Sequence, residues 1–528
     1  MSTKKNIKEI MSKRYIQIGI LIVLISLVCL MGTYAWFTWA SPSNTNVTLS
    51  IGNLADVTFT SGPDINISNL APVYNYTDGV STTFVMKNNS TTNNLNYEIK
   101  LDVTSISNEL KSESFKYTLL KDNKVVQTGN LKNAVNGNTL ILNTGSLDKG
   151  STSSPKISNF KLYFWLDGNM ENNSNMMNKS LVGKINIEEK LTYINTLFNN
   201  STKTPVTNNS ITYQYDTTNN LMQDTAGNIR YYGASPKNYI YFNCDSYPST
   251  NCELWRIIGV FDGKIKLMRN ESIGSMAYDD DYQDTYLQQL TSSDSNSVIK
   301  MLQYDNDSEV TAKLLAPSGN GQNDYSSSSL QKILNNYYYN KLNYTGTITY
   351  DFTNTGIKND TTRNMIAETT WNLGGWGSSD LFSNEMYEKE RGTTTVSNPS
   401  DGITRTTTWT GKIALAYPSD YGYATDLSKC SQTLYDYDNS TDSYACRTND
   451  WMYPIITNSG KNYGWLLTPS SGTADIAFGV YSPGYVNNYN RVYGAYGVAP
   501  VLYLGSDQDI VAGDGDGSQS NPYQLANS

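Results

Sequence analysis

Residues 252–269, CELWRIIGVFDGKIKLMR, decide how the second half of this 528-residue chain folds. Apolar residues alternate with polar ones on both sides of Asp262-Gly263. An Asp-Gly pair between two alternating runs is the strongest local signal for a tight two-residue turn between antiparallel strands. The stretch therefore predicts a β-hairpin.

The sequence around this hairpin predicts a mixed α+β region over residues 228–528. Tyr239–Phe242 is expected to form a short strand before it. Ser328–Leu342 places its leucines, isoleucine and two tyrosines on one helical face behind serines that can cap a helix, so it predicts one amphipathic helix. Later β segments are predicted at residues 463–470, 477–486 and 498–504.

Residues 41–195 have the pattern of an antiparallel β-sandwich of jelly-roll or immunoglobulin type. Apolar side chains recur at every second position in segments 83–88, 95–101, 115–120 and 160–166, as in half-buried strands. Residues 196–227 are polar and nearly free of apolar runs, and they predict a linker. The predicted fold class is thus mainly β with an α+β part.

Composition excludes several classes of function. The net charge is −9, and nucleic acid rewards a basic surface, so no nucleic-acid partner is expected. The chain has no His, which rules out Ser-His-Asp and Cys-His catalysis and His-ligated zinc. No pair of carboxylates is singled out for glycoside hydrolysis. We therefore expect a protein that is not an enzyme.

The first 40 residues predict export. A basic stub at 1–14 precedes a long uncharged apolar run, and residues 15–37 predict a transmembrane helix with the N-terminus in the cytoplasm and the bulk of the chain outside. The alternative is a signal peptide removed after Ala35 or Ala40, which would leave a secreted protein.

Four cysteines follow the apolar segment, as two close pairs in the sequence. An oxidising compartment favours disulfides, and four cysteines allow three connectivities. We favour the local pairing, which joins Cys244 to Cys252 and Cys430 to Cys446.

The end of the apolar segment and the sandwich strands carry a resemblance to a known group. The motifs are Gly32-Thr-Tyr-Ala-Trp-Phe37, the Thr83-Phe-Val-Met strand, Leu95-Asn-Tyr-Glu-Ile99 and Tyr163-Phe-Trp-Leu-Asp-Gly168. Over about residues 15–190 they resemble the TasA and camelysin matrix proteins of Gram-positive bacteria. The resemblance implies a jelly-roll-like domain, and some members of the group form biofilm fibres after their leader is cut. This chain departs from the group by its large second region.

The order of motifs after residue 228 carries a second resemblance. A Trp255-Arg256 hairpin, a helix, Trp465-Leu-Leu-Thr-Pro-Ser470 and a closing Val498-Ala-Pro-Val-Leu-Tyr-Leu504 are similar to a bacterial extracellular domain of unknown function. Members of that family look like the fold of C-type lectins and formylglycine-generating enzymes. The resemblance implies a C-type-lectin-like α+β domain. Ala499 stands where the family commonly has Arg.

In lectin-like folds the last hairpins build the ligand face, which directs attention to a tyrosine-rich stretch near the C-terminus. Tyr combines a rigid ring with a polar tip, and Asn supplies adaptable hydrogen bonds. The alternative is that both residue types merely cover exposed strands in a chain that contains 41 Tyr. The candidate ligand-binding residues are Tyr481, Tyr485, Asn487, Tyr489, Arg491 and Tyr493.

Calcium is the candidate cofactor, because lectin-like binding often uses it and hard cations take oxygen ligands. Asp279-Asp280-Asp281 with Asp284 form one acidic cluster, for which a solvated loop is the alternative. Asp514-Gly-Asp-Gly-Ser518 imitates the start of an EF-hand loop, but Leu525 stands where the bidentate Glu belongs. A series of turns is the alternative there.

Taken together, these patterns predict a membrane-anchored surface protein that binds an extracellular glycan or protein through a lectin-like module. The alternative is a secreted biofilm-matrix protein that assembles through its β-sandwich after the leader is cut. Whether the chain is cut after Ala35 or Ala40 separates the two hypotheses.

Overall fold

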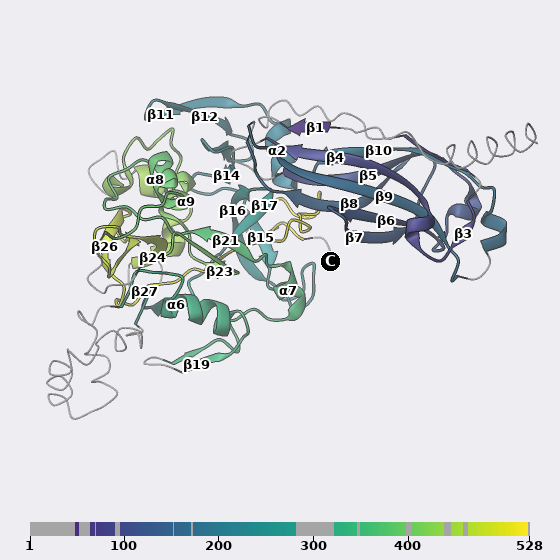
Figure 1. Ribbon diagram of the computed structural model, residues 1–528. Coiled ribbons are helices and arrows are strands. Elements are labelled where there is room, and N and C mark those ends of the chain that lie inside the picture. Colours follow the sequence, from purple (N-terminus) through teal and green to yellow (C-terminus); the bar gives the residue numbers. More distant parts are fainter. Residues whose placement is uncertain are drawn as a thin grey trace, which may run out of the picture. The chain divides into compact units, whose positions relative to one another are not determined.

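The structure is a computed structural model that forms two compact units, residues 1–190 and residues 191–528. The described part of the chain is mainly β, as predicted (Figure 1). The residues described are 48–51, 64–68, 70–89, 95–151, 153–170, 173–280, 321–345, 349–397, 404–437, 445–457 and 463–525.

The first unit contains two sheets that share one apolar core. The first has the order β1-β4-β9-β6-β7, with β3 paired to β9, and the second has the order β2-β10-β5-β8. The strands of the first are β1 (Thr48–Ile51), β3 (Pro72–Val73), β4 (Val80–Asn88), β6 (Phe115–Lys121), β7 (Lys124–Asn130) and β9 (Lys156–Asp167). The strands of the second are β2 (Asp64–Ile67), β5 (Leu95–Ile106), β8 (Thr139–Leu147) and β10 (Leu181–Glu189).

The predicted β-sandwich is confirmed by these two sheets. All four segments predicted as strands lie in β4, β5, β6 and β9. In β4 the buried positions alternate with partly exposed ones, so that Phe84 and Met86 enter the core that Ile185 and Ile187 of β10 also line. The short strand β1 pairs in parallel with β4, and β3 pairs in parallel with β9, which the antiparallel prediction did not include.

The predicted linker at 196–227 is wrong. These residues form most of helix α2 (Tyr193–Asn200) and the strands β11 (Thr204–Asn208), β12 (Ile211–Asp216) and β13 (Leu221–Gln223). The polar composition concealed an alternating strand, in which Tyr213 and Tyr215 are buried against Met222. Tyrosine rings supply the apolar area here that aliphatic side chains supply in most strands.

The second unit is built around a sheet of the order β11-β12-β13-β14-β16-β17-β28-β23, with β15 paired to β16. A smaller sheet has the order β18-β27-β24-β25-β26. The remaining strands of the large sheet are β14 (Ile229–Tyr231), β15 (Tyr239–Phe242), β16 (Glu253–Phe261), β17 (Lys264–Arg269), β23 (Ile413–Ala414) and β28 (Val501–Tyr503). Those of the small sheet are β18 (Ser275–Met276), β24 (Tyr463–Pro469), β25 (Ile476–Tyr481), β26 (Val486–Arg491) and β27 (Tyr496–Gly497).

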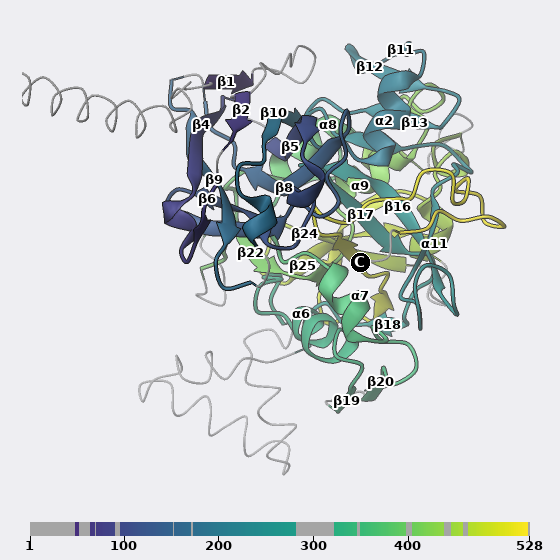
Figure 2. The ribbon, with the colours of Figure 1, turned by 90° about the vertical axis from the view of Figure 1, so that its right-hand side faces the viewer.

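Short helices and two small hairpins complete the second unit. Strands β19 and β20 lie at one extremity of the unit in both ribbon views (Figures 1 and 2). The hairpins are β19 (Asn343–Thr345) with β20 (Thr349–Asp351) and β21 (Thr369–Asn372) with β22 (Thr408–Gly411). The helices are α6 (Ser329–Lys332), α7 (Asp360–Met365), α8 (Ser383–Glu390), α9 (Pro418–Ala424) and α11 (Tyr453–Thr457).

The hairpin predicted from residues 252–269 is confirmed as β16 and β17. Asp262 and Gly263 have φ of 49° and 69°, the positive values that a type I′ turn requires at both central positions. Strand β28, from the predicted closing segment, pairs with β17 in the interior of the large sheet. The hairpin therefore joins strands from both ends of the unit.

The predicted helix at 328–342 is confirmed over its first part. Ser328 caps it by accepting a hydrogen bond from the Gln331 amide at 3.2 Å. After α6 the helix widens to a π-helix, η4 (Ile333–Tyr338), and it ends four residues before the predicted end. Lys341 has φ of 58°, which a helix cannot continue through, and β19 follows.

The stub at 1–14 and the predicted transmembrane helix at 15–37 lie outside the described residues. Among the described residues, no helix is long and apolar enough to cross a membrane.

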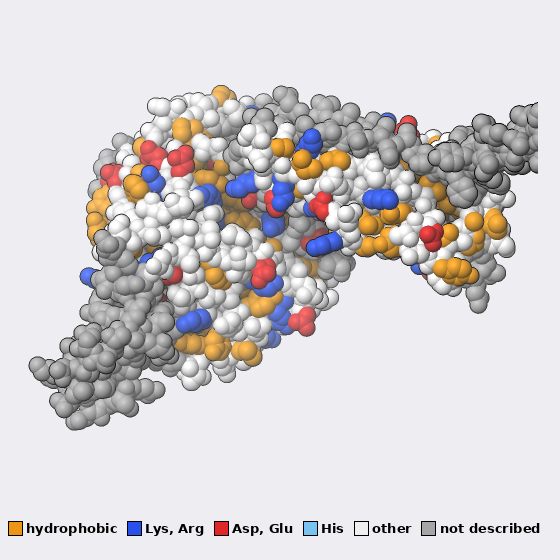
Figure 3. Space-filling view, in the orientation of Figure 1, with side chains coloured by type: hydrophobic (Ala, Val, Ile, Leu, Met, Phe, Trp, Pro, Cys, Tyr) orange, Lys and Arg blue, Asp and Glu red, His pale blue; other side chains and the backbone are white. Residues whose placement is uncertain are grey.

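Disulfides join Cys244 to Cys252 and Cys430 to Cys446, which are the two local pairings. Charged side chains are few and scattered on the face in Figure 3.

Candidate functional site

A continuous row of aromatic rings lies at one end of the small sheet of the second unit. We call it the tyrosine ridge, and its members are Tyr435, Tyr463, Tyr481, Tyr485 and Tyr496. Tyr481 and Tyr485 stack with their ring centres 5.2 Å apart and their planes at 20°. Tyr463 lies edge-on to Tyr481 at 4.2 Å and to Tyr496 at 5.5 Å. Tyr435 extends the row beyond Tyr485 at 6.0 Å.

Strand register explains why these rings meet. Tyr463 begins β24 and Tyr481 ends β25, and the two residues are direct antiparallel partners. Tyr496 begins β27, which runs parallel to β24. Beneath them Trp465 is buried, with its ring centre 4.6 Å from that of Tyr496 and its indole N–H donating to the Met276 carbonyl at 2.8 Å. The ridge therefore rests on a fixed apolar base.

Three side chains donate hydrogen bonds to the backbone carbonyls of the turn that precedes Tyr485. The Tyr421 hydroxyl donates to the Gly484 carbonyl at 2.6 Å, and the Arg447 guanidinium donates to the Pro483 carbonyl at 2.6 Å. The Tyr453 hydroxyl donates to the Ser482 carbonyl. Gly484 has φ of 109°, and a Cβ there would lie 2.6 Å from Arg447, so only glycine fits this turn.

The ridge tyrosines are half-buried or exposed, and for Tyr481 and Tyr496 burial favours the neutral form. Burial, followed by the neighbouring tyrosines, raises the pKa of Tyr481 to about 12. Burial also raises the pKa of Tyr496. Tyr435 has 45% of its surface exposed. The ridge offers ring faces and hydroxyl tips to a ligand and no charge of its own.

The predicted ligand residues divide into two groups in the structure. Tyr481 and Tyr485 belong to the ridge. On edge strand β26 the buried positions alternate with exposed ones, so that Asn487, Tyr489 and Arg491 point to the outer face. Tyr489 is 67% exposed, and the Asn487 side-chain oxygen accepts a hydrogen bond from its amide at 2.6 Å.

Arg491 and Tyr493 lie at and just after the end of β26, outside the ridge. Arg491 forms an ion pair with Asp475, so its charge is already matched within the chain. Tyr493 lies in the turn after β26 and is 48% exposed. The predicted ligand residues did not include Tyr435, Tyr463 or Tyr496 of the ridge. Tyr463 could have been found, because it starts the Tyr-Gly-Trp strand that pairs with the strand ending at Tyr481.

Two carboxylates of the predicted calcium sites already accept hydrogen bonds from the chain's own donors. The buried Asp279 carboxylate accepts hydrogen bonds from the amides of Gln322 and Ser329 at 2.7 and 3.0 Å. Asp516 accepts from the Ser518 amide and from Lys237 at 3.1 Å. Asp281 and Asp284 lie outside the described residues. Within the described part of the chain, no three acidic or cysteine side chains gather as metal ligands would.

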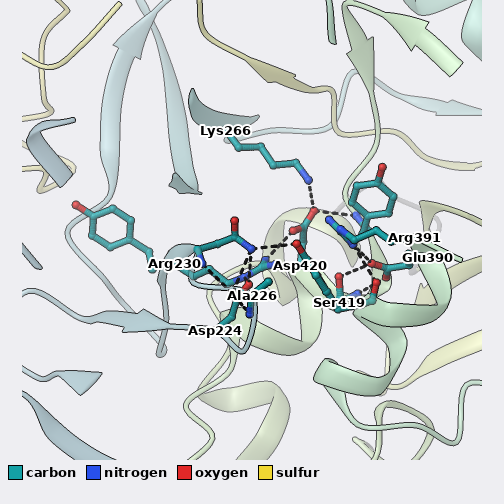
Figure 4. Close-up of polar contacts among 12 residues, drawn as sticks. Asp224, Ala226, Arg230, Lys266, Glu390, Arg391, Ser419 and Asp420 are labelled. Atoms are coloured by element: carbon teal, nitrogen blue, oxygen red, sulfur yellow. Dashed lines mark hydrogen bonds and ion pairs between the residues drawn. The ribbon is translucent and has the colours of Figure 1, made fainter. Parts of the chain in front are cut away.

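A second cluster, which the sequence did not predict, lies in the interior of the second unit (Figure 4). We call it the buried ion cluster, and its charged members are Asp224, Arg230, Lys266, Glu390, Arg391 and Asp420. Arg230 on β14 donates to Asp224 at 2.6 Å and to Asp420 at 2.8 Å. Lys266 on β17 contacts the other Asp420 oxygen. The side chains of Lys266 and Asp420 are 0% exposed.

Glu390, at the end of α8, forms the other part of the cluster. It pairs with Arg391 at 3.0 Å and accepts hydrogen bonds from the amide and hydroxyl of Ser419 at 2.8 and 2.5 Å. Burial raises the pKa of Glu390 to about 7. Burial would also raise the pKa of Asp420, but the charges of Lys266 and Arg230 hold it at about 2.

Comparisons with known proteins add only distant likenesses. No protein-family profile matches the chain, and no curated protein is similar to it. One similar solved structure is a family 35 carbohydrate-binding module from an environmental isolate, at 14% identity and a TM-score of 0.16 over 28% of this chain and 84% of that chain. Another is the pre-peptidase C-terminal domain of a Bacillus anthracis collagenase, at 12% identity and a TM-score of 0.15 over 28% of this chain and 99% of that chain.

Proposed function

We propose that this chain is an exported surface protein, held at the membrane by its N-terminal segment, whose second unit binds an extracellular sugar chain through the tyrosine ridge. The proposal is one of binding without catalysis, by a module of C-type-lectin-like architecture. The single observation that carries it is the row of five partly exposed rings on a fixed base.

The chemistry of the ridge suits a neutral polar ligand. Sugars present apolar C–H faces and hydroxyl edges, and tyrosine matches both with a ring face and a polar tip. A ring that loses only two torsions on binding costs little conformational entropy. The three donors behind the turn of Tyr485 fix its backbone before a ligand arrives, which lowers that cost further.

Three features of the second unit support binding over catalysis. The chain has no His to act as a base near neutral pH. The four cysteines after the apolar segment are joined in disulfides and are not free nucleophiles. The charged groups with shifted pKa in the buried ion cluster are enclosed by the core, where a substrate has no access to Lys266 or Asp420.

A glycan and protein array probed with residues 41–528 tests the proposal. Tyr485→Ala with Tyr435→Ala is expected to weaken binding to any glycan hit by at least about 10-fold, or about 1.4 kcal/mol, because two stacking faces are lost. Tyr74→Ala is the matched control, since this 78% exposed tyrosine lies in the first unit. Unchanged affinity in the ridge variant, or hits confined to proteins, would refute a sugar-binding ridge.

One observation favours the alternative of assembly through the β-sandwich. Strand β7 ends one sheet and β8 ends the other, and on them Val125, Val126 and Ile141 are 50%, 42% and 50% exposed. Natural edge strands are normally protected from pairing with another chain, and exposed β-branched residues at an edge favour such pairing.

Sedimentation of residues 41–528 tests this alternative. If the edge mediates assembly, the wild-type chain forms large species and Val125→Lys with Val126→Lys returns it to a monomer, because a charged edge resists pairing. A monomeric wild-type chain excludes the alternative. N-terminal sequencing of the extracellular fraction complements the test, because a start at Trp36 or Ser41 is required for a released matrix protein.

A further inference from the structure

Lys266 and Asp420 are the most enclosed ion pair of the buried ion cluster. They come from β17 and α9, and the Lys266 amine contacts Asp420 Oδ2 directly. Neither side chain has any exposed surface. We propose that these two side chains condense in the folded protein to form an intramolecular amide bond between Lys266 Nζ and Asp420 Cγ.

The reaction balances without any further reactant. The Nζ–Cγ bond forms and the Cγ–Oδ2 bond breaks. Oδ2 leaves as water with two of the three ammonium protons of Lys266, and the third proton stays on the amide nitrogen. The positive charge of the ammonium and the negative charge of the carboxylate cancel. Asp420 Oδ1 remains as the amide oxygen.

The hydrogen bonds around Asp420 fit this outcome. Arg230 donates a hydrogen bond to Oδ1 at 2.8 Å. This donor polarises the carbonyl under attack, and after the reaction it donates to the amide oxygen. The Tyr417 amide donates to Oδ2 at 3.0 Å, on the oxygen that departs. The attacked carbon is therefore positioned between a donor for the retained oxygen and a donor for the leaving oxygen.

Charge pairing within the cluster is preserved by the reaction. Before condensation three cations face three anions. Afterwards Arg230 still has Asp224 as its ion-pair partner and Arg391 still has Glu390. These two pairs lie at 2.6 and 3.0 Å in the structure. Two desolvated charges are replaced by a neutral amide, and burying charges is far more costly than burying a hydrogen-bonded amide. The surroundings thus favour the product without leaving any charge unpaired.

The aromatic shell around Lys266 supports attack and protects the product. The amine lies 4.5 Å from the ring centre of Tyr417 and 5.2, 5.5 and 5.3 Å from those of Phe261, Trp371 and Tyr503. These rings exclude water, which would otherwise solvate the amine and hydrolyse the bond. Burial lowers the pKa of Lys266 to about 8, which favours transfer of an ammonium proton to the contacting Asp420 Oδ2 and leaves a neutral, nucleophilic amine.

Mass spectrometry of the purified full chain tests the bond. After reduction of both disulfides, the intact mass is expected to be lower by one water than the mass calculated for the observed N-terminus. Proteolysis is expected to release one branched peptide that joins the segments of Lys266 and Asp420. An unmodified mass together with separate linear peptides for the two segments would overturn the proposal.

Lys266→Met is the matched variant, because it keeps the length and much of the volume of the side chain and cannot condense. Its intact mass is expected to show no loss of water. The same loss in Lys266→Met as in the wild-type chain would place the dehydration elsewhere and refute the assignment. Since the wild-type measurement stands alone, the test holds even if the variant folds poorly.

Discussion

Replacing Asp420 by Ala is expected to lower the free energy of unfolding of the second unit by at least about 3–5 kcal/mol, because the variant can form neither the ion pair nor the amide bond with Lys266. The variant removes the common partner of Lys266 and Arg230. The Lys266 ammonium is then left buried with no opposite charge in contact, and an uncompensated charge in a dry interior is the most destabilising consequence of breaking a buried pair. Urea unfolding followed by tryptophan fluorescence measures the change.

The double variant Asp420→Ala with Lys266→Met separates charge from packing. Neither variant chain can form an amide bond at this pair, so their difference reports only the orphaned charge. We expect the double variant to be more stable than Asp420→Ala, because the buried ammonium is gone. Equal stability would show that lost packing, and not charge, explains the effect. Lys429→Ala is the control, because its side chain is 57% exposed in the ion pair with Asp426, and it should change stability by about 0–1 kcal/mol.

Local signals predicted the elements whose geometry is set within a few residues. Asp262-Gly263 fixed the central hairpin because its two residues accept positive φ. Ser328 marked the start of a helix because its hydroxyl caps the first turn. The sandwich strands were predicted because each buries one face. Burial of one face makes apolar and polar residues alternate along the strand, and this pattern is visible in the sequence.

Features that depend on which distant segments meet were not predictable from the sequence. The polar sequence at 204–223 predicts a linker and not strands, because the apolar area of these strands comes from Tyr213 and Tyr215, whose burial depends on Tyr423 and Leu427 far along the chain. The sequence predicts only part of the ridge. Tyr481 and Tyr485 lie close together in the sequence, whereas Tyr435 is distant in the sequence and meets Tyr485 only in the fold. The buried ion cluster joins five segments, and no local pattern distinguishes Asp420 from the exposed acids.

The unfolding free energy is expected to fall steadily from about pH 4 to about pH 8 because of Asp450. Burial raises the pKa of Asp450 from 3.8 to about 8, although Thr425 and the amides of Met452 and Tyr453 donate to its oxygens. Between these pH values the folded chain holds a proton that the unfolded chain releases. The contribution of Asp450 to the free energy of unfolding is therefore fully present below about pH 4. It decreases by about 1.4 kcal/mol per pH unit as the pH rises toward 8.

Asp450→Asn is expected to remove that slope and to raise stability at pH 8. The amide oxygen of Asn can still accept from the Met452 and Tyr453 amides at 2.7 and 3.2 Å, and its NH₂ can donate to Thr425 Oγ1. Asn carries no charge, so it has no ionised form to desolvate. Glu390, with its pKa near 7, contributes a slope of the same sign that the variant leaves in place.

Urea unfolding at several pH values measures the difference between wild type and variant, and the difference isolates Asp450. Asp426→Asn is the matched control, because this second buried carboxylate accepts hydrogen bonds from the Ser428 amide and hydroxyl and, unlike Asp450, is paired with a lysine, Lys429. Its substitution should leave the slope unchanged. If Asp450→Asn and wild type show parallel curves, Asp450 stays ionised in the folded chain, because the three donors then outweigh burial and hold the pKa low.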